Sequence, residues 1–202
     1  LGIARFIEAR AADLRPRPPW VVDQLAHHYG AAVSLAAELG PNARTDAFPD
    51  DLAEHARRWV TEAADRARRD QAAPSAVRLY TQALDLLDLA HLRADDDPVR
   101  AAEAVRLLLA RSASAVEGWE LALARGDADL TRKVAEHLGD ERAVARAVLA
   151  RGAVQQREGD REAAIASHAD AADRFRVLGD LAGLGEALRQ RGMVEIFAGR
   201  VD

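Results

Sequence analysis

The chain of 202 residues has no cysteine, a single lysine (Lys133) and only 4% aromatic residues. Without cysteine there can be no disulfide, no thiolate metal site and no cysteine nucleophile. Such a composition fits a reducing compartment, so we expect a cytoplasmic protein. Lys133 stands in the stretch 130–134, which lacks the glycines of a phosphate-binding loop. Any ATPase activity is therefore expected to lie outside this chain.

Long apolar runs are missing as well. The sequence has no run of about 18 apolar residues, and its start lacks the charged and apolar regions of a signal peptide. We therefore expect neither a membrane span nor secretion. The formal net charge is −5, so no basic stripe is available to neutralise the phosphates of a nucleic acid. Direct binding to DNA or RNA is not expected.

Alanine, leucine and arginine are abundant, and these residues favour helices over strands. The chain is 30% charged and 49% apolar, which makes it polar enough to dissolve and apolar enough to pack. The composition predicts an all-α fold.

An internal repeat is the clearest sign of organisation. Residues 139–160 align with 179–200 at a constant separation of 40. The matched pairs are Leu138-Gly139-Asp140 with Leu178-Gly179-Asp180, Arg151-Gly152 with Arg191-Gly192, Val154 with Val194, and Gly159 with Gly199. A fixed period of about 20 to 50 residues is the signature of a solenoid whose units bury their apolar faces against one another.

Each repeat is predicted to be a helical hairpin. Gly159 and Asp160 interrupt two stretches with helical apolar spacing, and Asp160 is suited to cap the second helix. A glycine inside a helix costs about 1 kcal/mol relative to alanine, so Gly152 and Gly192 require a packing reason. We expect a close helix crossing at both positions.

An earlier hairpin is predicted at 52–88, with a first helix over 52–69 and a second beginning at Pro74 or Ser75. Asp97 and Pro98 then begin another helix, as its N-cap and first residue, which runs to about residue 113. Over 114–138 we expect two shorter helices separated at Gly126-Asp127.

The N-terminal part differs from the repeats. Clustered prolines at 16–19 separate a short helix over about 2–14 from a second over about 20–39, and 40–51 is predicted to be a loop. We therefore predict a helical cap or junction over 1–48 and a helical array over 49–202. The array is expected to end in a truncated repeat, and the chain to be a piece of a longer protein.

Two stretches carry the pattern of small and aromatic residues that resembles the tetratricopeptide repeat family. They are Ala76-x3-Tyr80-x2-Ala83 and Gly152-x6-Gly159-x4-Ala164. The resemblance implies a right-handed solenoid of antiparallel helical hairpins, with about nine or ten helices in this chain. Two positions that are usually aromatic in that family hold Ala67 and Gln155, and the period of 40 exceeds the usual 34, which implies longer helices or loops.

A second resemblance concerns the order of two motifs separated by a polar loop. They are Leu25-Ala26-His27-His28-Tyr29 and Arg78-Leu79-Tyr80-x2-Ala83-Leu84-x-Leu86-Leu87. This order resembles the segment after the ATPase module in bacterial nucleotide-cyclase-like proteins and LuxR-type transcriptional regulators. The resemblance implies a sensor or interaction tail that controls an upstream ATPase and an output domain.

No catalytic, metal or cofactor site is predicted. Adjacent His27 and His28 point about 100° apart on a helix, so they do not form a metal-binding pair. The other histidines, His168 among them, lack ligand spacing and are expected at the surface. The acidic run 95–97 is explained by a helix N-cap, and no serine stands in a nucleophile-elbow context. Trp20, Trp59 and Trp119 are expected in the core or at helix junctions.

The candidate binding site is the groove lined by the first helices of the hairpins. Residues on their exposed faces are predicted to be Asp65, Arg68, Gln156, Arg157, Arg189 and Met193. An arginine-rich wall suits a carboxylate, a phosphate or an acidic peptide, although for any single one of these residues an ordinary solvated helix face is the better interpretation.

Two functions are compatible with such a groove. The first is a protein-interaction scaffold that holds a protein or peptide partner, which could be another domain of the same polypeptide. The alternative is a small-molecule sensor whose ligand controls an attached ATPase. We also expect Ile196 and Phe197 to be partly exposed, because a helix that would cover them is missing, and to favour a homodimer through the C-terminal end.

Overall fold

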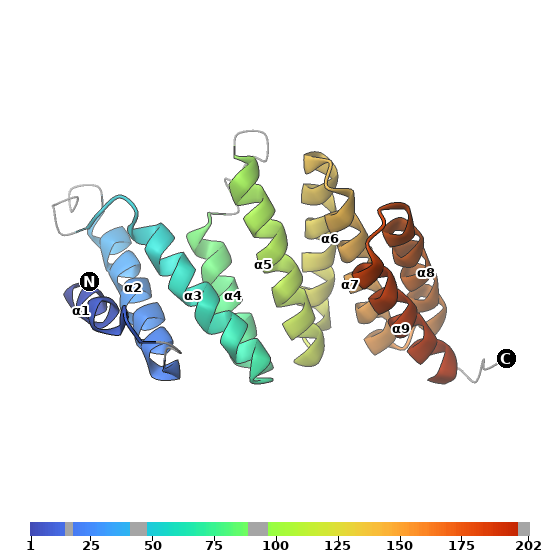
Figure 1. Ribbon diagram of the computed structural model, residues 1–202, viewed down its shortest axis with the longest axis horizontal. Coiled ribbons are helices and arrows are strands. Elements are labelled where there is room, and N and C mark those ends of the chain that lie inside the picture. The colour runs from blue at the N-terminus through green and yellow to red at the C-terminus, as the bar shows by residue number, and fades with distance from the viewer. Residues whose placement is uncertain (15–17, 41–47, 89–96, 198–202) are drawn as a thin grey trace. The chain divides into compact units, whose positions relative to one another are not determined.

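The structure is a computed structural model that describes residues 1–14, 18–40, 48–88 and 97–197 (Figure 1). Within these ranges there are nine helices and no strand. The all-α fold predicted from composition is thereby confirmed for the described part of the chain. The helices fall into two compact units, one made of α1–α4 and the other of α5–α9, and each is described here by itself.

In the first unit each helix packs on the next one along the chain. Its helices are α1 (Gly2–Ala11), α2 (Pro19–Leu39), α3 (Leu52–Arg69) and α4 (Ala73–Leu86). The bounds predicted for α2 and α3 agree closely with these, whereas α1 ends three residues before the predicted 14. We predict a boundary between residues 48 and 49, which falls between α2 and α3, and these two helices pack together. The division into a helical cap over 1–48 and an array over 49–202 stays a prediction.

The second unit contains α5 (Pro98–Glu117), α6 (Leu121–Leu138), α7 (Glu141–Glu158), α8 (Arg161–Val177) and α9 (Leu181–Phe197). Consecutive helices again pack side by side, and in addition α7 contacts both α5 and α9. Since short turns join neighbouring helices, successive helices run antiparallel. The odd-numbered helices α5, α7 and α9 therefore run in the same direction and share one side of the unit.

The last three turns of the second unit repeat one local structure every 20 residues. Gly139, Gly159 and Gly179 adopt left-handed conformations with φ of 65°, 86° and 66°. The aspartate after each glycine caps the next helix. The backbone N–H groups of Ala143, Ala163 and Gly183 donate to Oδ1 of Asp140, Asp160 and Asp180 at 2.9, 3.1 and 3.0 Å. The Gly-Asp pairs thus end one helix and begin the next, which confirms the turn and cap predicted at Gly159 and Asp160.

The predicted start of α5 is also confirmed. Asp97 accepts a hydrogen bond from the Arg100 N–H at 2.9 Å, and Pro98 is the first residue of the helix. The prediction for 114–138 is wrong, however. α6 runs through Gly126-Asp127 without a break, and the chain turns instead at Gly118–Glu120, where Trp119 has a φ of 62°.

Tertiary packing explains why α6 continues through Gly126-Asp127. Asp127 is buried and accepts two hydrogen bonds from the Arg111 guanidinium of α5, at 2.9 Å from Nε and 2.7 Å from Nη2. An aspartate that appears to be a turn residue in the sequence is therefore half of an ion pair between two helices.

The close crossing predicted at Gly152 is observed. A Cβ at this position would lie 2.6 Å from the imidazole of His168, which comes from α8. The same expectation is wrong for Gly192, because a Cβ there would meet no heavy atom of the described residues within 4 Å. His168 itself is fully buried, which corrects the prediction of a surface histidine.

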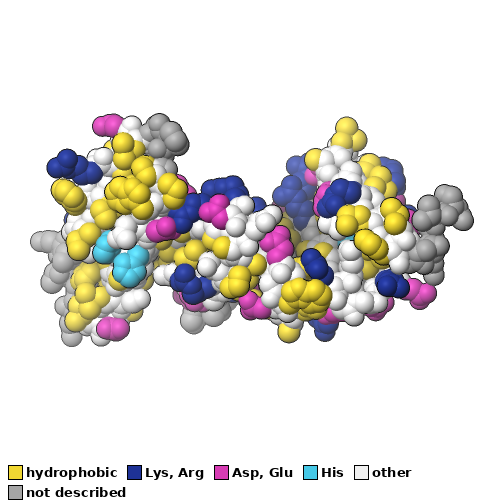
Figure 2. All heavy atoms as spheres, turned by 90° about the horizontal axis from the view of Figure 1, so that it is seen from below, with side chains coloured by type: hydrophobic (Ala, Val, Ile, Leu, Met, Phe, Trp, Pro, Cys, Tyr) yellow, Lys and Arg dark blue, Asp and Glu magenta, His cyan; other side chains and the backbone are white. Residues whose placement is uncertain are grey.

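The three tryptophans lie in different environments. Trp59 is buried in the core of the first unit, whereas Trp20 and Trp119 are 58% and 64% exposed. Trp20 lies at the start of α2, and exposed apolar side chains on the neighbouring α1 include Ile3 and Phe6. Figure 2 shows apolar side chains gathered over this part of the first unit.

Candidate functional site

A groove of about 700 Å³ crosses the second unit. Its walls come from α5, α7 and α9, together with Trp119 from the turn that follows α5. No even-numbered helix contributes, because α6 and α8 lie on the other side of the odd-numbered ones. The lining residues are Ser112, Ala113, Val116, Glu117, Trp119, Arg146, Leu149, Ala150, Ala153, Gln156, Arg157, Arg189, Gln190, Met193 and Phe197.

Four of the six predicted groove residues line this groove: Gln156, Arg157, Arg189 and Met193. They come from two helices that the repeat of 40 relates, α7 and α9. The other two, Asp65 and Arg68, lie on α3 in the first unit and do not belong to this lining.

Asp65 and Arg68 form a separate polar cluster around Tyr80 of α4. The Tyr80 hydroxyl donates to Asp65 Oδ1 at 2.6 Å. Burial, reinforced by this hydrogen bond to Asp65, raises the pKa of Tyr80 above its ordinary value, while Arg68 lowers it by a smaller amount. These contacts join α3 to α4, so the cluster stabilises the hairpin.

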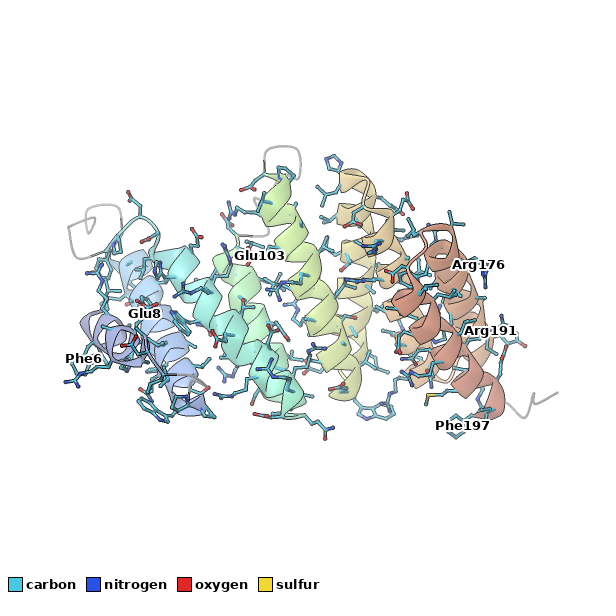
Figure 3. The ribbon with its side chains drawn as sticks, viewed as in Figure 1. Phe6, Glu8, Glu103, Arg176, Arg191 and Phe197 are labelled. Atoms are coloured by element: carbon cyan, nitrogen blue, oxygen red, sulfur yellow. The ribbon has the colours of Figure 1, made fainter. Side chains whose placement is uncertain are left out.

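One end of the groove is rich in large apolar side chains. Trp119, Met193 and Phe197 are 64%, 38% and 71% exposed there. The guanidinium of Arg157 lies over the Trp119 ring, 5.2 Å from its centroid, in a cation–π arrangement. Figure 3 shows Phe197 at the last turn of α9, and the second unit seen from below displays apolar side chains beside cationic ones (Figure 2).

Arginine and amide side chains line the rest of the groove, and Arg189 borders the apolar end, since its Nη1 lies 3.1 Å from Met193 Sδ. Arg189 is held by Glu186, which accepts from its Nε at 2.9 Å and its Nη2 at 2.7 Å, and Gln190 donates to the same carboxylate at 2.9 Å. These hydrogen bonds, led by those from Arg189, lower the pKa of Glu186. Arg146 is exposed and has no carboxylate partner among the described residues.

The described residues offer no metal site. No group of three or more histidine, aspartate or glutamate side chains converges within 1–14, 18–40, 48–88 or 97–197. His27 is exposed, and His28 contacts Gln24 at 3.2 Å within the same helix. The acidic run at 95–97 lies outside the described residues except for Asp97, whose carboxylate caps α5.

The sequence prediction did not include two residues that define the groove, Trp119 and Arg146. Arg146 could have been found from its spacing, because it precedes Arg157 by 11 residues, three helical turns on the same face of α7. Trp119 could not have been found from the sequence, because its place in the groove depends on the left-handed turn at Gly118–Glu120.

The chain matches no protein-family model and no curated protein sequence. In the part of the chain that the structure describes, no helix combines the length and apolar character that crossing a membrane requires.

Proposed function

We propose that this chain is a non-catalytic, tetratricopeptide-like interaction segment whose odd-numbered helices hold a protein or peptide partner. In this proposal the helices form a right-handed solenoid of antiparallel hairpins, and the segment belongs to a larger, cytoplasmic signalling or regulatory protein. The observation that carries the proposal is the groove, because α5, α7 and α9 line it together. Such a surface, formed by alternate helices of successive hairpins, is what a repeat array presents to a partner.

The chemistry of the groove supports binding rather than catalysis. Exposed Trp119 and Phe197 provide apolar contact area, and aromatic and arginine side chains are enriched where proteins bind one another. Glu186, beside the groove, has a role that needs no reaction, since it holds Arg189 and Gln190 in place. The partner could be another domain of the same polypeptide.

Site-specific photo-crosslinking tests this proposal in the cells that produce the protein. A photoreactive residue replaces Ala153, in the floor of the groove, or Ala166, which is exposed on α8 outside the groove. We expect a defined polypeptide adduct from residue 153 and none from residue 166. Equal labelling from both residues, or no adduct from residue 153, would contradict the proposal.

A small-molecule sensor is the second candidate, because a volume of about 700 Å³ falls in the range of ligand pockets. Thermal unfolding with the dialysable fraction of a cell extract separates the two functions. A ligand at about 100 times its dissociation constant stabilises the folded state by about 2.7 kcal/mol. A raised midpoint that Ala153→Trp abolishes, without any polypeptide adduct, would favour the sensor.

We further propose that Ile196 and Phe197, which are 61% and 71% exposed, allow the chain to form a homodimer through this end. Light scattering at increasing concentration, compared with the double variant Ile196→Ser and Phe197→Ser, tests this. A strictly monomeric chain at high concentration would rule out the dimer.

A further inference from the structure

The two regions of the groove differ in charge and in apolar character. Near the ends of α5, α7 and α9, Trp119, Met193 and Phe197 form an apolar surface. Arg157 is already stacked on Trp119, and Glu117 stands in the same lining, so positive and negative charges balance there. This end therefore favours an apolar side chain over an anion.

Arg146 makes the other region attractive to an anion. It is exposed, it faces the groove from α7, and no described carboxylate pairs with it. Arg189 is already occupied, because Glu186 accepts from two of its nitrogens at 2.7 and 2.9 Å and its Nη1 lies 3.1 Å from Met193 Sδ, at the border of the apolar region. The net positive charge of this region comes from Arg146, whose fork of donors can bind a carboxylate.

The distance between the two regions limits the ligand. Arg146 and Arg157 lie 11 residues apart on α7, which corresponds to about 16 Å at 1.5 Å per residue. An extended peptide advances about 3.3–3.6 Å per residue, so about four to five residues cover this distance. A compact metabolite would reach one region but not both.

We propose that the ligand of the groove is an extended peptide segment with an acidic side chain at one end and large apolar side chains at the other. Its acidic side chain pairs with Arg146, and its apolar side chains, about four to five residues away, pack on Trp119, Met193 and Phe197. This inference rests on the proposed interaction function and adds to it the chemistry, spacing and direction of the partner.

The experiment measures binding of dye-labelled, end-blocked peptides to the intact chain by fluorescence anisotropy. The test peptide carries two aspartates and two leucines separated by four serines. The first control places the aspartates directly beside the leucines, and the second replaces the aspartates by asparagines. A third peptide carries phosphoserines in place of the aspartates, to distinguish a carboxylate from a phosphate as the anion. We expect the spaced acidic peptide to bind most tightly, with an affinity that falls as salt is raised.

Two variants test the assigned contacts. Arg146→Ala should weaken the spaced acidic peptide by about twofold to fivefold, the range of an exposed ion pair, and should leave the asparagine peptide unchanged. Trp119→Ala should weaken both peptides, because it removes apolar contact area. Arg161→Ala is the matched control, since this exposed arginine of α8 is not part of the groove lining and should have no effect.

The proposal is overturned if none of the peptides binds, if spaced and compact peptides bind equally, or if asparagine replaces aspartate without loss. Tighter binding of the phosphoserine peptide would overturn the carboxylate assignment. The peptide experiment can fail while the proposed interaction function remains supported. In that case residue 153 would still give a polypeptide crosslink, although the test peptides do not bind as expected.

Discussion

The imidazole of His168 packs against the backbone of Gly152, so closely that a Cβ at residue 152 would lie 2.6 Å from both Cε1 and Nδ1 of the ring. α7 and α8 approach each other at this point because residue 152 has no side chain. Gly192 occupies the same place in the next repeat, 40 residues later, and a Cβ there would meet no heavy atom within 4 Å in the described part of the chain. Of the two glycines related by the repeat, Gly152 is therefore tightly packed and Gly192 has open space beside it among the described residues.

Alanine substitution at these two glycines should change stability in opposite directions. Gly152→Ala forces the His168 ring or the helix to move, and such overpacking costs about 1–3 kcal/mol. Gly192→Ala gains helix propensity without a clash, and should stabilise by about 0.5–1 kcal/mol. Thermal unfolding followed by circular dichroism measures both. Equal effects of the two substitutions would show that the crossing at Gly152 is not tight.

The buried His168 should make stability depend on pH. Burial lowers the pKa of His168, and the charge of Glu186 on α9 opposes this shift without reversing it. Neither ring nitrogen has a hydrogen-bond partner among the described residues. The unfolded chain therefore takes up a proton near the ordinary histidine pKa of about 6.5, while the folded chain does so only at lower pH.

The direction of this effect follows from the proton balance. Above about pH 6.5 the neutral His168 leaves the free energy of unfolding at its full value. As the pH falls from there toward the pKa of His168 in the folded protein, the free energy of unfolding decreases by up to about 1.4 kcal/mol per pH unit. Denaturant unfolding between pH 7.5 and 5.5 measures it. His168→Leu, which keeps a similar volume but cannot be protonated, should flatten the dependence. An unchanged slope in this variant would show that other groups cause it.

The ion pair of Arg111 and Asp127 should contribute strongly to the stability of the second unit. Their side chains are 13% and 4% exposed, and burial raises the pKa of Asp127 even though Arg111 opposes the shift. Arg111→Ala should cost about 3–5 kcal/mol because it leaves a buried carboxylate without its partner. Arg176→Ala, which breaks an exposed pair with Asp173, should cost at most about 1 kcal/mol. Urea unfolding compares them, and similar losses would contradict this assignment.

Both tyrosines of the chain should resist ionisation. Burial and a hydrogen bond to Glu8 raise the pKa of Tyr29 to about 12, and burial with a hydrogen bond to Asp65 raises that of Tyr80 further. The chain has only these two tyrosines, so the folded protein should show almost no tyrosinate absorbance at pH 10. In denaturant about half of the tyrosine should be ionised at that pH. In the folded protein at pH 10, ionisation of about a quarter of the tyrosine would show that one hydroxyl is free, and ionisation of about half would show that both are.

Trp119 combines exposure with a left-handed backbone. Its φ of 62° is unfavourable for a residue with a side chain by about 1–2 kcal/mol. Trp119→Gly should relieve this strain and, after the entropy cost of glycine, leave stability unchanged or raise it by up to about 1 kcal/mol. The same variant should lose affinity for the spaced acidic peptide. A large loss of stability would instead indicate that Trp119 holds the turn together.

Where local chemistry is decisive, the sequence alone determined the structure. The Gly-Asp pairs at 139–140, 159–160 and 179–180 end and begin helices because a left-handed glycine and an aspartate cap act on neighbouring backbone groups. The same reasoning places Asp97 at the start of α5. The hairpin pattern also predicted Gln156, Arg157, Arg189 and Met193 on the exposed faces of the first helices, and these four residues line one groove.

Tertiary structure decided whatever depends on residues distant in the sequence. Asp127 has the appearance of a turn residue, but Arg111 from α5 holds it within α6. His168 resembles a surface histidine, yet Gly152 leaves the space in which its ring is buried. Trp119 and Arg146 face a common groove only because α5 and α7 pack side by side. Local patterns carry no information about such partners, since each partner is supplied by another helix.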